Sequence, residues 1–253
     1  MNALKAQFNV ILALIIKELQ VRFGTKKLGY FWLFLEPILH IVPFFFIRKI
    51  LGKWQVEELI IFLVTGIVTV MFFTKTVSKI QASVSANRAL FAYRQIKPVD
   101  IALARLFIEC IISLGVFTLM LFVFVLFFQE FPSMKTLPLA IFALVMFVVI
   151  TFSCGVILMI ATTRLTFLDA IIPTVMRLIY FSSGAFFSVS DVPYSLRHLL
   201  LLNPIVHVVE ILRFNLMPKQ ITNYGNIAYI STCAFALLGF AMVLYFINKR
   251  KLV

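Results

Sequence analysis

Charged residues, and acidic ones in particular, are scarce in this sequence of 253 residues. Asp and Glu together number 10 and Lys and Arg 23, so only 13% of the residues are charged while 62% are hydrophobic. A soluble domain carries about 25% charged residues, so this composition excludes an ordinary soluble protein. Several apolar runs approach or exceed the roughly 20 residues that cross a bilayer. The sequence therefore predicts an all-α, polytopic membrane protein.

The motifs of nucleotide-binding and hydrolytic sites are missing as well. The chain contains no GxxxxGKS/T loop, no HExxH and no GxSxG, so it has no phosphate-cradling loop of its own. Its three cysteines lie inside apolar runs and its three histidines are scattered. This pattern favours buried small residues over a metal site or a disulfide. We expect no catalytic residue, no metal and no cofactor, and interpret the chain as a transport protein rather than an enzyme.

Basic residues are plentiful by comparison, and the formal net charge is +13. In a soluble protein this charge would suggest a nucleic-acid partner. Here the basic residues lie between apolar runs, so membrane topology explains them and we expect no nucleic acid. With the N-terminus inside, the inner segments hold about twice as many Lys and Arg residues as the outer ones, which predicts that both termini are cytoplasmic.

We predict one permease domain over residues 1–253, with six transmembrane helices and two further helical segments. The crossings cover residues 29–47, 59–74, 101–128, 137–161, 170–187 and 227–247. Residues 1–27 carry apolar side chains at helical spacing, which predicts an amphipathic helix on the membrane surface. Residues 192–218 are apolar but broken by prolines, which favours a re-entrant helical hairpin buried against protein. Pro37 and Pro43 are expected to kink the first crossing.

Polar residues inside the first crossing form the first candidate site. Trp32, Glu36 and His40 recur every four residues and share one helix face, with Tyr30 at its cytoplasmic mouth. Ionisable groups in hydrocarbon cost at least a few kcal/mol each. Two readings stay open: Glu36 pairs with a neighbouring helix and fixes packing, or this face lines a wet conduit for sugars. Sugars bind through hydroxyl hydrogen bonds and through stacking on aromatic rings, which the second reading uses.

The fifth crossing carries a second polar pair, Arg177 and Tyr180, which follows Pro173. Arg177 lies inside the span rather than at an end, where it could snorkel to a headgroup. It either faces an anionic polymer or its phospholipid terminus, or it pairs with Glu36. We include both residues among the candidates that line the conduit.

Two further polar groups are interpreted structurally. Arg105 and Glu109 are one helical turn apart and are expected to pair near the start of the third crossing. His207, Glu210 and Arg213 recur every three residues, and we expect them to form a local polar cluster at the membrane surface.

Residues 78–100 join the second and third crossings on the predicted cytoplasmic side. Ile80, Val84 and Phe91 form a thin apolar stripe among polar and basic residues. A basic loop around a helix end explains the charge, whereas a docking helix for a cytoplasmic partner also explains the helical pattern, and we favour docking. The docking residues that we expect are Arg88, Phe91, Tyr93 and Arg94.

Three segments carry a resemblance to a known family: RFGTKKLGYFWLFLEP, ALFAYRQIKPVDIALAR and LLNPIVHVVEILR. In this order and spacing the chain resembles, over nearly its whole length, the inner-membrane permease of capsular polysaccharide ABC exporters (KpsM type). The resemblance implies a homodimer in the bacterial inner membrane that exports an anionic lipid-linked polysaccharide from cytoplasm to periplasm. It also implies two copies of a separate ATPase that binds ATP and Mg, and periplasmic and outer-membrane export proteins as further partners.

By the same resemblance, residues 78–100 receive the ATPase, residues 1–27 form an interface helix and residues 192–218 form periplasmic re-entrant helices. Two alternatives stay open. One is an ABC permease for another cargo, such as O-antigen, teichoic acid or a drug. The other is a proton-coupled secondary transporter that uses Glu36, His40 and Glu109 as a relay, although no inverted repeat is visible.

Overall fold

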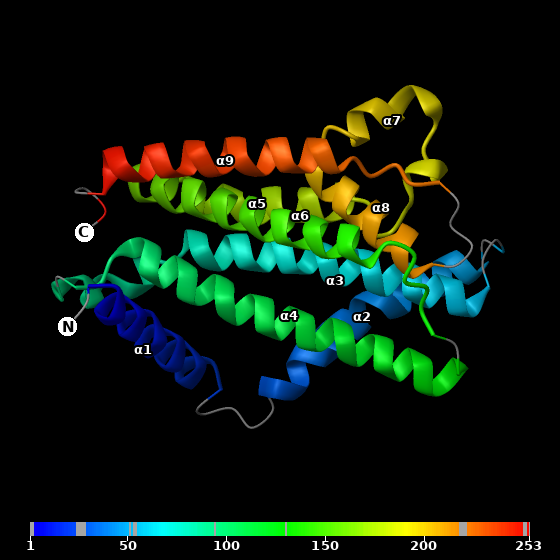
Figure 1. Cartoon of the computed structure of the whole chain (residues 1–253), viewed down its shortest axis with the longest axis horizontal. Coiled ribbons are helices and arrows are strands. Elements are labelled where there is room, and N and C mark those ends of the chain that lie inside the picture. The colour runs from blue at the N-terminus through cyan, green and yellow to red at the C-terminus, as the bar shows by residue number, and fades with distance from the viewer. Residues whose placement is uncertain are drawn as a thin grey trace.

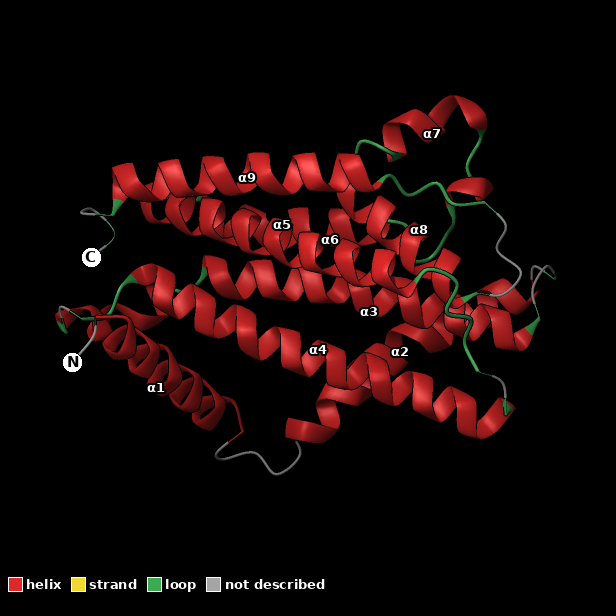
Figure 2. Ribbon diagram, viewed as in Figure 1, coloured by secondary structure: helices red, strands yellow, loops and turns green. Residues whose placement is uncertain are grey.

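The computed structural model describes residues 3–23, 29–50, 52, 55–93, 95–129, 131–217, 222–249 and 252. Within these ranges the regular secondary structure is entirely helical (Figure 2). Five helices are long and apolar enough to cross a membrane, and a bent helix pair would add a sixth span. The prediction of an all-α, polytopic membrane protein is therefore confirmed.

The helices follow the predicted order along the chain. They are α1 (Ala3–Phe23), α2 (Gly29–Ile50), α3 (Val56–Gln81), the 3-10 helix η1 (Ser85–Ala92), α4 (Pro98–Phe128), α5 (Leu137–Arg164), α6 (Leu168–Ser182), the 3-10 helix η2 (Val189–Asp191), α7 (Tyr194–Leu200), α8 (Pro204–Leu216) and α9 (Ile227–Asn248). Figure 1 shows that the start of α1 and the end of α9 lie at one end of the bundle, while α7 lies at the other.

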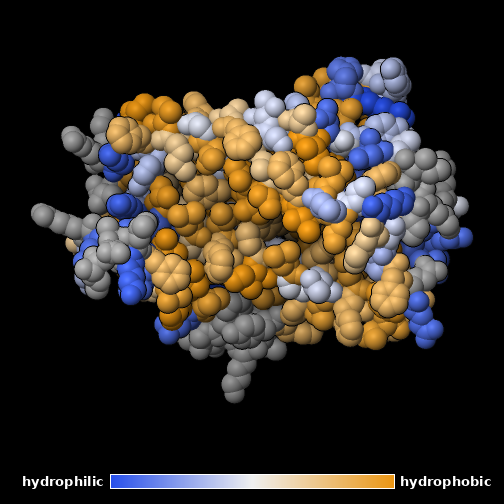
Figure 3. Space-filling model, in the orientation of Figure 1, coloured by the Kyte–Doolittle hydropathy of each residue, from blue (hydrophilic) through white to orange (hydrophobic). Residues whose placement is uncertain are grey.

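The surface of the bundle has an apolar middle and hydrophilic ends, as the face drawn in Figure 3 shows. Large side chains of α4 such as Phe107, Ile111 and Phe122 are more than half exposed. Soluble monomers rarely expose such a continuous apolar area. In a bilayer these side chains face lipid, which agrees with the number of helices that could span a membrane.

The helix α3 lies at the centre of the bundle and contacts α2, α4, α5, α6 and α8. Of its most apolar 18-residue window 78% is buried, against 11% for α4. Two glycines let other segments approach closely. A Cβ at Gly66 would lie 2.4 Å from the Ala185 carbonyl oxygen, and one at Gly155 of α5 would lie 2.7 Å from the Cβ of Ile80. Small residues at such contacts are typical of membrane helix packing.

Several helix bounds differ from the predicted crossings. The second crossing extends to Gln81 instead of ending at Thr74, and the first continues through its prolines to Ile50. The fifth ends at Ser182 rather than at residue 187, because Gly184 adopts a φ of +74° and turns the chain. With its 15 residues, α6 is about 22 Å long, which is shorter than the hydrocarbon core of about 30 Å.

The predicted break in residues 192–218 is present as far as Met217, where the described part of this segment ends. The helices α7 and α8 meet at an angle of 108°, as in a broken span or a re-entrant loop. Pro204 occupies the first turn of α8, and Asn203 caps it by accepting a hydrogen bond from the Ile205 amide at 3.0 Å. A side-chain cap and an N-terminal proline are standard helix-start signals.

The N-terminal helix is present over Ala3–Phe23, while residues 24–28 lie outside the described ranges. Its apolar residues divide between two surroundings. Leu14 is buried against Ile101 and Ala104 of α4, whereas Phe8 and Leu12 are exposed. One side of α1 therefore packs on the bundle, and the exposed apolar side chains remain available for a membrane surface.

Candidate substrate conduit and coupling region

An open pocket of about 400 Å³, mainly apolar in surface but bordered by ionisable side chains, lies between α2, α3 and α6, and we term it the conduit pocket. Four of the six residues that the sequence predicts for the conduit border it, namely Glu36, His40, Arg177 and Tyr180. The α3 wall consists of Met71 and a polar stretch formed by Thr74, Lys75, Ser78 and Lys79. Ionisable and hydroxyl side chains from three separate helices thus border one pocket.

The Glu36 carboxylate has a partner on the α3 wall. Lys75 Nζ lies 2.6 Å from Glu36 Oε2, and the two side chains are 32% and 30% exposed. Ion pairs that water reaches contribute about 0–1 kcal/mol. Glu36 therefore has the basic neighbour that the packing reading requires, and it lies in the cavity that the conduit reading requires. Its ion-pair partner is Lys75 and not Arg177.

Two other residues that border the pocket are hydrogen-bonded to each other. His40 Nδ1 and the Tyr180 hydroxyl are 2.6 Å apart, and the two rings meet edge to face with centroids 5.4 Å apart. Tyr180 also contacts the ring of Phe186 edge to face. This pair joins α2 to α6 and holds two hydrogen-bonding side chains at the pocket wall.

The other two residues predicted for the conduit are Trp32 on the same helix face and Tyr30 at its mouth. Trp32 is 56% exposed and does not line the pocket, and the side chain of Tyr30 lies outside the described part of the structure. On α3, Lys79 lies one turn beyond Lys75, and its ammonium contacts Glu109 of α4. A stacking role of Trp32 stays a prediction.

Sequence reasoning missed the α3 wall. It ended the second crossing at Thr74 and assigned Lys75 and Lys79 to a cytoplasmic loop. A signal was present, since the two lysines are four residues apart, and Thr74 and Ser78 are also four apart. This spacing places all of them on one side of a helix.

The predicted pair between Arg105 and Glu109 is wrong, because each has a partner on α1. Glu109 is buried, with 3% exposure, and its Oε1 accepts hydrogen bonds from Arg22 Nη2 at 2.5 Å and from Lys79 Nζ at 2.6 Å. Arg105 Nε lies 3.2 Å from Glu18 Oε1, and its Nη1 donates to the Lys79 carbonyl at 2.5 Å. These contacts tie α1 to α3 and α4.

The helix α1 is also tied to η1. Lys17 Nζ donates a hydrogen bond of 2.8 Å to Asn87 Oδ1, and Asn87 Nδ2 donates to the Ser83 carbonyl at 3.1 Å. The segment η1 has a kink at Asn87, where the backbone is non-helical, and α1 contacts it at this residue.

The predicted docking residues have different surroundings. Arg88 is exposed and Tyr93 is 66% exposed, so both are accessible at this end of the bundle. Phe91 is partly buried and packs on the clusters around Ile101 and Ile80. Arg94 lies outside the described residues. Arg88 and Tyr93 therefore remain candidates for a partner surface, whereas Phe91 has a packing role within this chain.

The predicted polar cluster of α8 is present and is deeply buried against other parts of the chain. Arg213 is 0% exposed and its Nη1 lies 3.6 Å from Glu210 Oε1. Its guanidinium stacks 3.5 Å above the Phe62 ring and donates to the carbonyls of Phe62, Ala185 and Phe187. The non-helical chain after α6 needs such donors where water is absent.

The rest of this cluster is hydrogen-bonded in the same way. Glu210 Oε1 accepts from the Ser188 hydroxyl at 3.1 Å and from the Val189 amide at 3.3 Å. His207 Nε2 lies 2.7 Å from the Leu201 carbonyl, and its Nδ1 accepts from the Asn226 amide at 3.1 Å. These side chains fix the turns around η2 and α7, which is a structural role.

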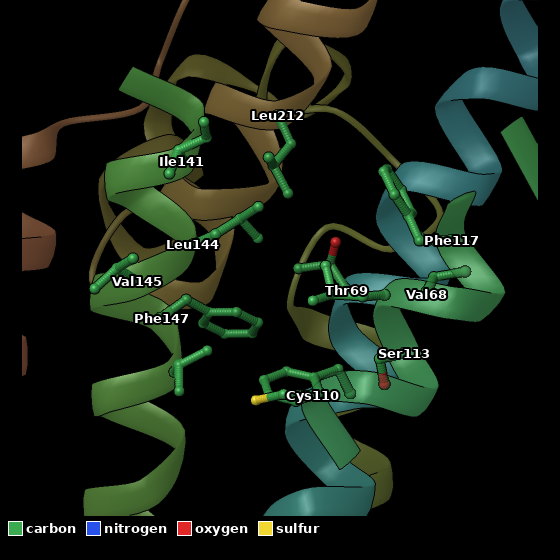
Figure 4. A pocket seen from close by; sticks show the side chains of 13 residues that line it. Val68, Thr69, Cys110, Ser113, Phe117, Ile141, Leu144, Val145, Phe147 and Leu212 are labelled. Carbon is green, nitrogen blue, oxygen red and sulfur yellow. The ribbon is translucent and has the colours of Figure 1, made fainter. Parts of the chain in front are cut away.

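An apolar cavity of about 350 Å³ lies elsewhere in the bundle, between α3, α4, α5 and α8 (Figure 4). Leu144 and Phe147 of α5 face Phe117 of α4 across it, and Thr69 and Ser113 contribute hydroxyls. Its lining offers no charged side chain. A cavity of this kind suits hydrocarbon rather than sugar, so we separate it from the conduit pocket.

A bundle of membrane-spanning helices with a pocket between them that ionisable side chains border defines an integral membrane protein of the transporter class. The chain belongs to the ABC-2 type transporter family, which matches residues 9–217. It is 29% identical to the polysialic acid transport protein KpsM of Escherichia coli, over 92% of this chain and 91% of that protein. It is also 28% identical to two capsule polysaccharide export inner-membrane proteins, CtrC of Neisseria meningitidis serogroup B and BexB of Haemophilus influenzae. Each of these alignments covers 96% of this chain and 92% of the relative.

Proposed function

We propose that this protein is the transmembrane subunit of an ATP-driven exporter in the bacterial inner membrane. Its cargo is a lipid-linked capsular polysaccharide, which it moves from the cytoplasm to the periplasm. The observation that carries the proposal is the conduit pocket, an open pocket between helices of an ABC-2 chain that charged and hydroxyl side chains border. The capsule-export names of its relatives support the choice of cargo.

The chemistry of the conduit pocket suits an anionic sugar polymer. Hydroxyls of Thr74, Ser78 and Tyr180 can exchange hydrogen bonds with the hydroxyls of a sliding sugar chain. Three cations and one carboxylate border the pocket among the described residues. Basic side chains form strong charge-assisted hydrogen bonds with carboxylate and phosphate groups. The excess positive charge therefore favours acidic sugars or a phosphate-bearing lipid anchor.

The proposal requires partner proteins. A homodimer would bring two conduit pockets together, and two ATPase subunits would supply the ATP and Mg sites that the sequence lacks. The end of the bundle that carries α1, η1, Arg88 and Tyr93 would be cytoplasmic, together with both termini, and would receive the ATPases. The end that carries η2 and α7 would be periplasmic and would pass the polymer to further export proteins.

The test is copurification from native membranes at wild-type expression, followed by ATPase and glycan analysis. We expect an ATPase and an anionic glycan to copurify, and Lys75→Gln to reduce the glycan while the ATPase stays bound. Lys49→Gln, at the exposed far end of α2, is the matched control and should retain the glycan. Transport without a bound ATPase would instead favour a proton-coupled transporter, and an O-antigen, teichoic acid or drug in the eluate would replace the capsule as cargo.

A further inference from the structure

Lys79 belongs to two sites at once. Its ammonium lies 2.6 Å from Glu109 Oε1, in the group of ion pairs that holds α1. The same side chain lines the conduit pocket and is 36% exposed. Arg22 of α1 lies 2.5 Å from the same carboxylate oxygen. One buried oxygen is therefore shared by two cations, of which one faces the pocket and the other belongs to α1.

An anion in the conduit pocket would compete with Glu109 for Lys79. A lysine has a flexible stem and three donors, so its ammonium can turn to a new partner without a change of the backbone. Once it turns away, Glu109 keeps Arg22 alone. The two cations repel each other at short range and divide one oxygen between them. Removal of Lys79 therefore strengthens the contact between Arg22 and Glu109.

We propose that Lys79 exchanges between Glu109 and a phosphate group bound in the conduit pocket, and that this exchange couples the pocket to the attachment of α1. This rests on the proposed function, since it takes the pocket as the site of an anionic cargo. In the empty state Lys79 is bonded to Glu109. In the occupied state Lys79 is bonded to the phosphate, and Arg22 holds Glu109 alone.

The effect is confined to the last turn of α1. The contacts of Lys17 with Asn87 and of Glu18 with Arg105 do not involve the Lys79 ammonium and persist in both states. Occupation of the pocket therefore tightens α1 around Arg22 without releasing the helix. By linkage, anything that holds Arg22 on Glu109 raises the affinity of the pocket for phosphate by the same factor.

Hydrogen exchange of the full-length protein in neutral nanodiscs tests the exchange of Lys79. Decyl phosphate is the probe and decanol its uncharged control. We expect decyl phosphate, but not decanol, to slow amide exchange over residues 18–23 by at least about fivefold, the lower end of usual coupling between sites.

Three variants separate this coupling from attraction of α1 to a charged surface. Lys79→Gln should show slow exchange over residues 18–23 without the probe and no further response to it. Lys79→Arg should restore the response. Lys75→Gln also removes a pocket cation with a carboxylate partner, but it should keep the response at a higher probe concentration.

An equal response in Lys79→Gln and wild type would overturn the proposal, as would no wild-type response at saturating probe. These outcomes are distinct from those of the export assay. A copurified ATPase and glycan without a response of α1 would leave the proposed function intact and remove the exchange. A response of α1 without a copurified glycan would leave the exchange of Lys79 intact and remove the proposed function.

Discussion

Two acid–base pairs of this protein have the same chemistry and opposite surroundings. Glu36 and Lys75 are 2.6 Å apart and about one-third exposed, whereas Glu210 and Arg213 are 3.6 Å apart and almost fully buried. The shorter bridge contributes little to stability, because water screens it and solvates either partner when the other is lost. The longer one cannot lose a partner without leaving a buried charge uncompensated. Burial, rather than distance, therefore separates the structural pair from the functional candidate.

The surroundings of each pair reinforce this difference. Arg213 donates hydrogen bonds to three backbone carbonyls and also pairs with Glu210. Its charge therefore stabilises the fold of the chain around η2. Glu36 and Lys75 border a cavity, so their remaining hydrogen-bonding capacity faces a space that a ligand can enter. The following substitutions test the comparison, beginning with the largest expected effect.

Arg213→Met should destabilise the protein most. It leaves Glu210 buried without its cation and removes the donors of three carbonyls, at a cost of about 3–5 kcal/mol. We expect a strongly lowered melting temperature in detergent, or a loss of folded protein. Lys75→Met is the matched control and should change stability by about 1 kcal/mol or less. Equal melting of the two variants would remove the distinction between the pairs.

Gly66→Ala tests the contact beside the buried pair. The new methyl group would lie 2.4 Å from both the Ala185 carbonyl oxygen and Arg213 Nη2, and such overpacking costs about 1–3 kcal/mol. The melting temperature should fall accordingly. Gly115→Ala on α4 is the control, because no atom lies within 4 Å of the added Cβ. If Gly66→Ala melts like wild type, α3 and the segment after α6 are not in tight contact.

Glu36→Gln should separate function from folding at the open pair. It keeps the size and the hydrogen bonding of the side chain and removes its charge, so stability should change by about 1 kcal/mol or less. Export should change, because the pocket becomes more positive and Lys75 is released. Melting and surface polysaccharide are measured on the same strains, with Leu33→Met as control. Early melting of Glu36→Gln together with normal export by Trp32→Ala would make the whole face structural.

Arg88→Ala and Tyr93→Ala should have the smallest effect on stability, within about 0.5 kcal/mol, because both side chains are surface-exposed. We expect the double variant to stay in the membrane and to uncouple ATP hydrolysis from export. Phe91→Ala should differ by also lowering the melting temperature, since Phe91 packs on two clusters. Normal ATPase binding and export in the double variant would remove the docking assignment.

The sequence predicts the helices well because their signals are local. The predicted starts of the fourth and sixth crossings, Leu137 and Ile227, coincide with those of α5 and α9. Helix periodicity also places Glu36 and His40 on one face, and both border the conduit pocket. The end of α3 is harder to predict, because Lys75 and Lys79 are typical of a loop at a helix end. Only the fold shows that Glu36 and Glu109 face them.

The partners of buried charges are the part that local reasoning does not reach. The sequence predicts a local cluster of Arg213 with Glu210, but only the fold reveals that Arg213 also donates to the carbonyls of Ala185 and Phe187. Arg105 and Glu109 have helical spacing for a pair, yet α1 supplies closer partners in Glu18 and Arg22. Spacing predicts which contacts are possible, and tertiary packing selects among them.

The contacts of α3 also set an order for biogenesis. Lys75 finds Glu36 39 residues earlier in the chain, whereas the Phe62 carbonyl receives Arg213 151 residues later. Because a chain is synthesised from its N-terminus, both members of the Glu36–Lys75 pair are present long before Arg213 is made. The centre of the bundle is finished only when α8 arrives. A chain that stalls before residue 204 would therefore lack Arg213, the donor to the Phe62 and Ala185 carbonyls, and we expect it to be degraded rather than to form a smaller working permease.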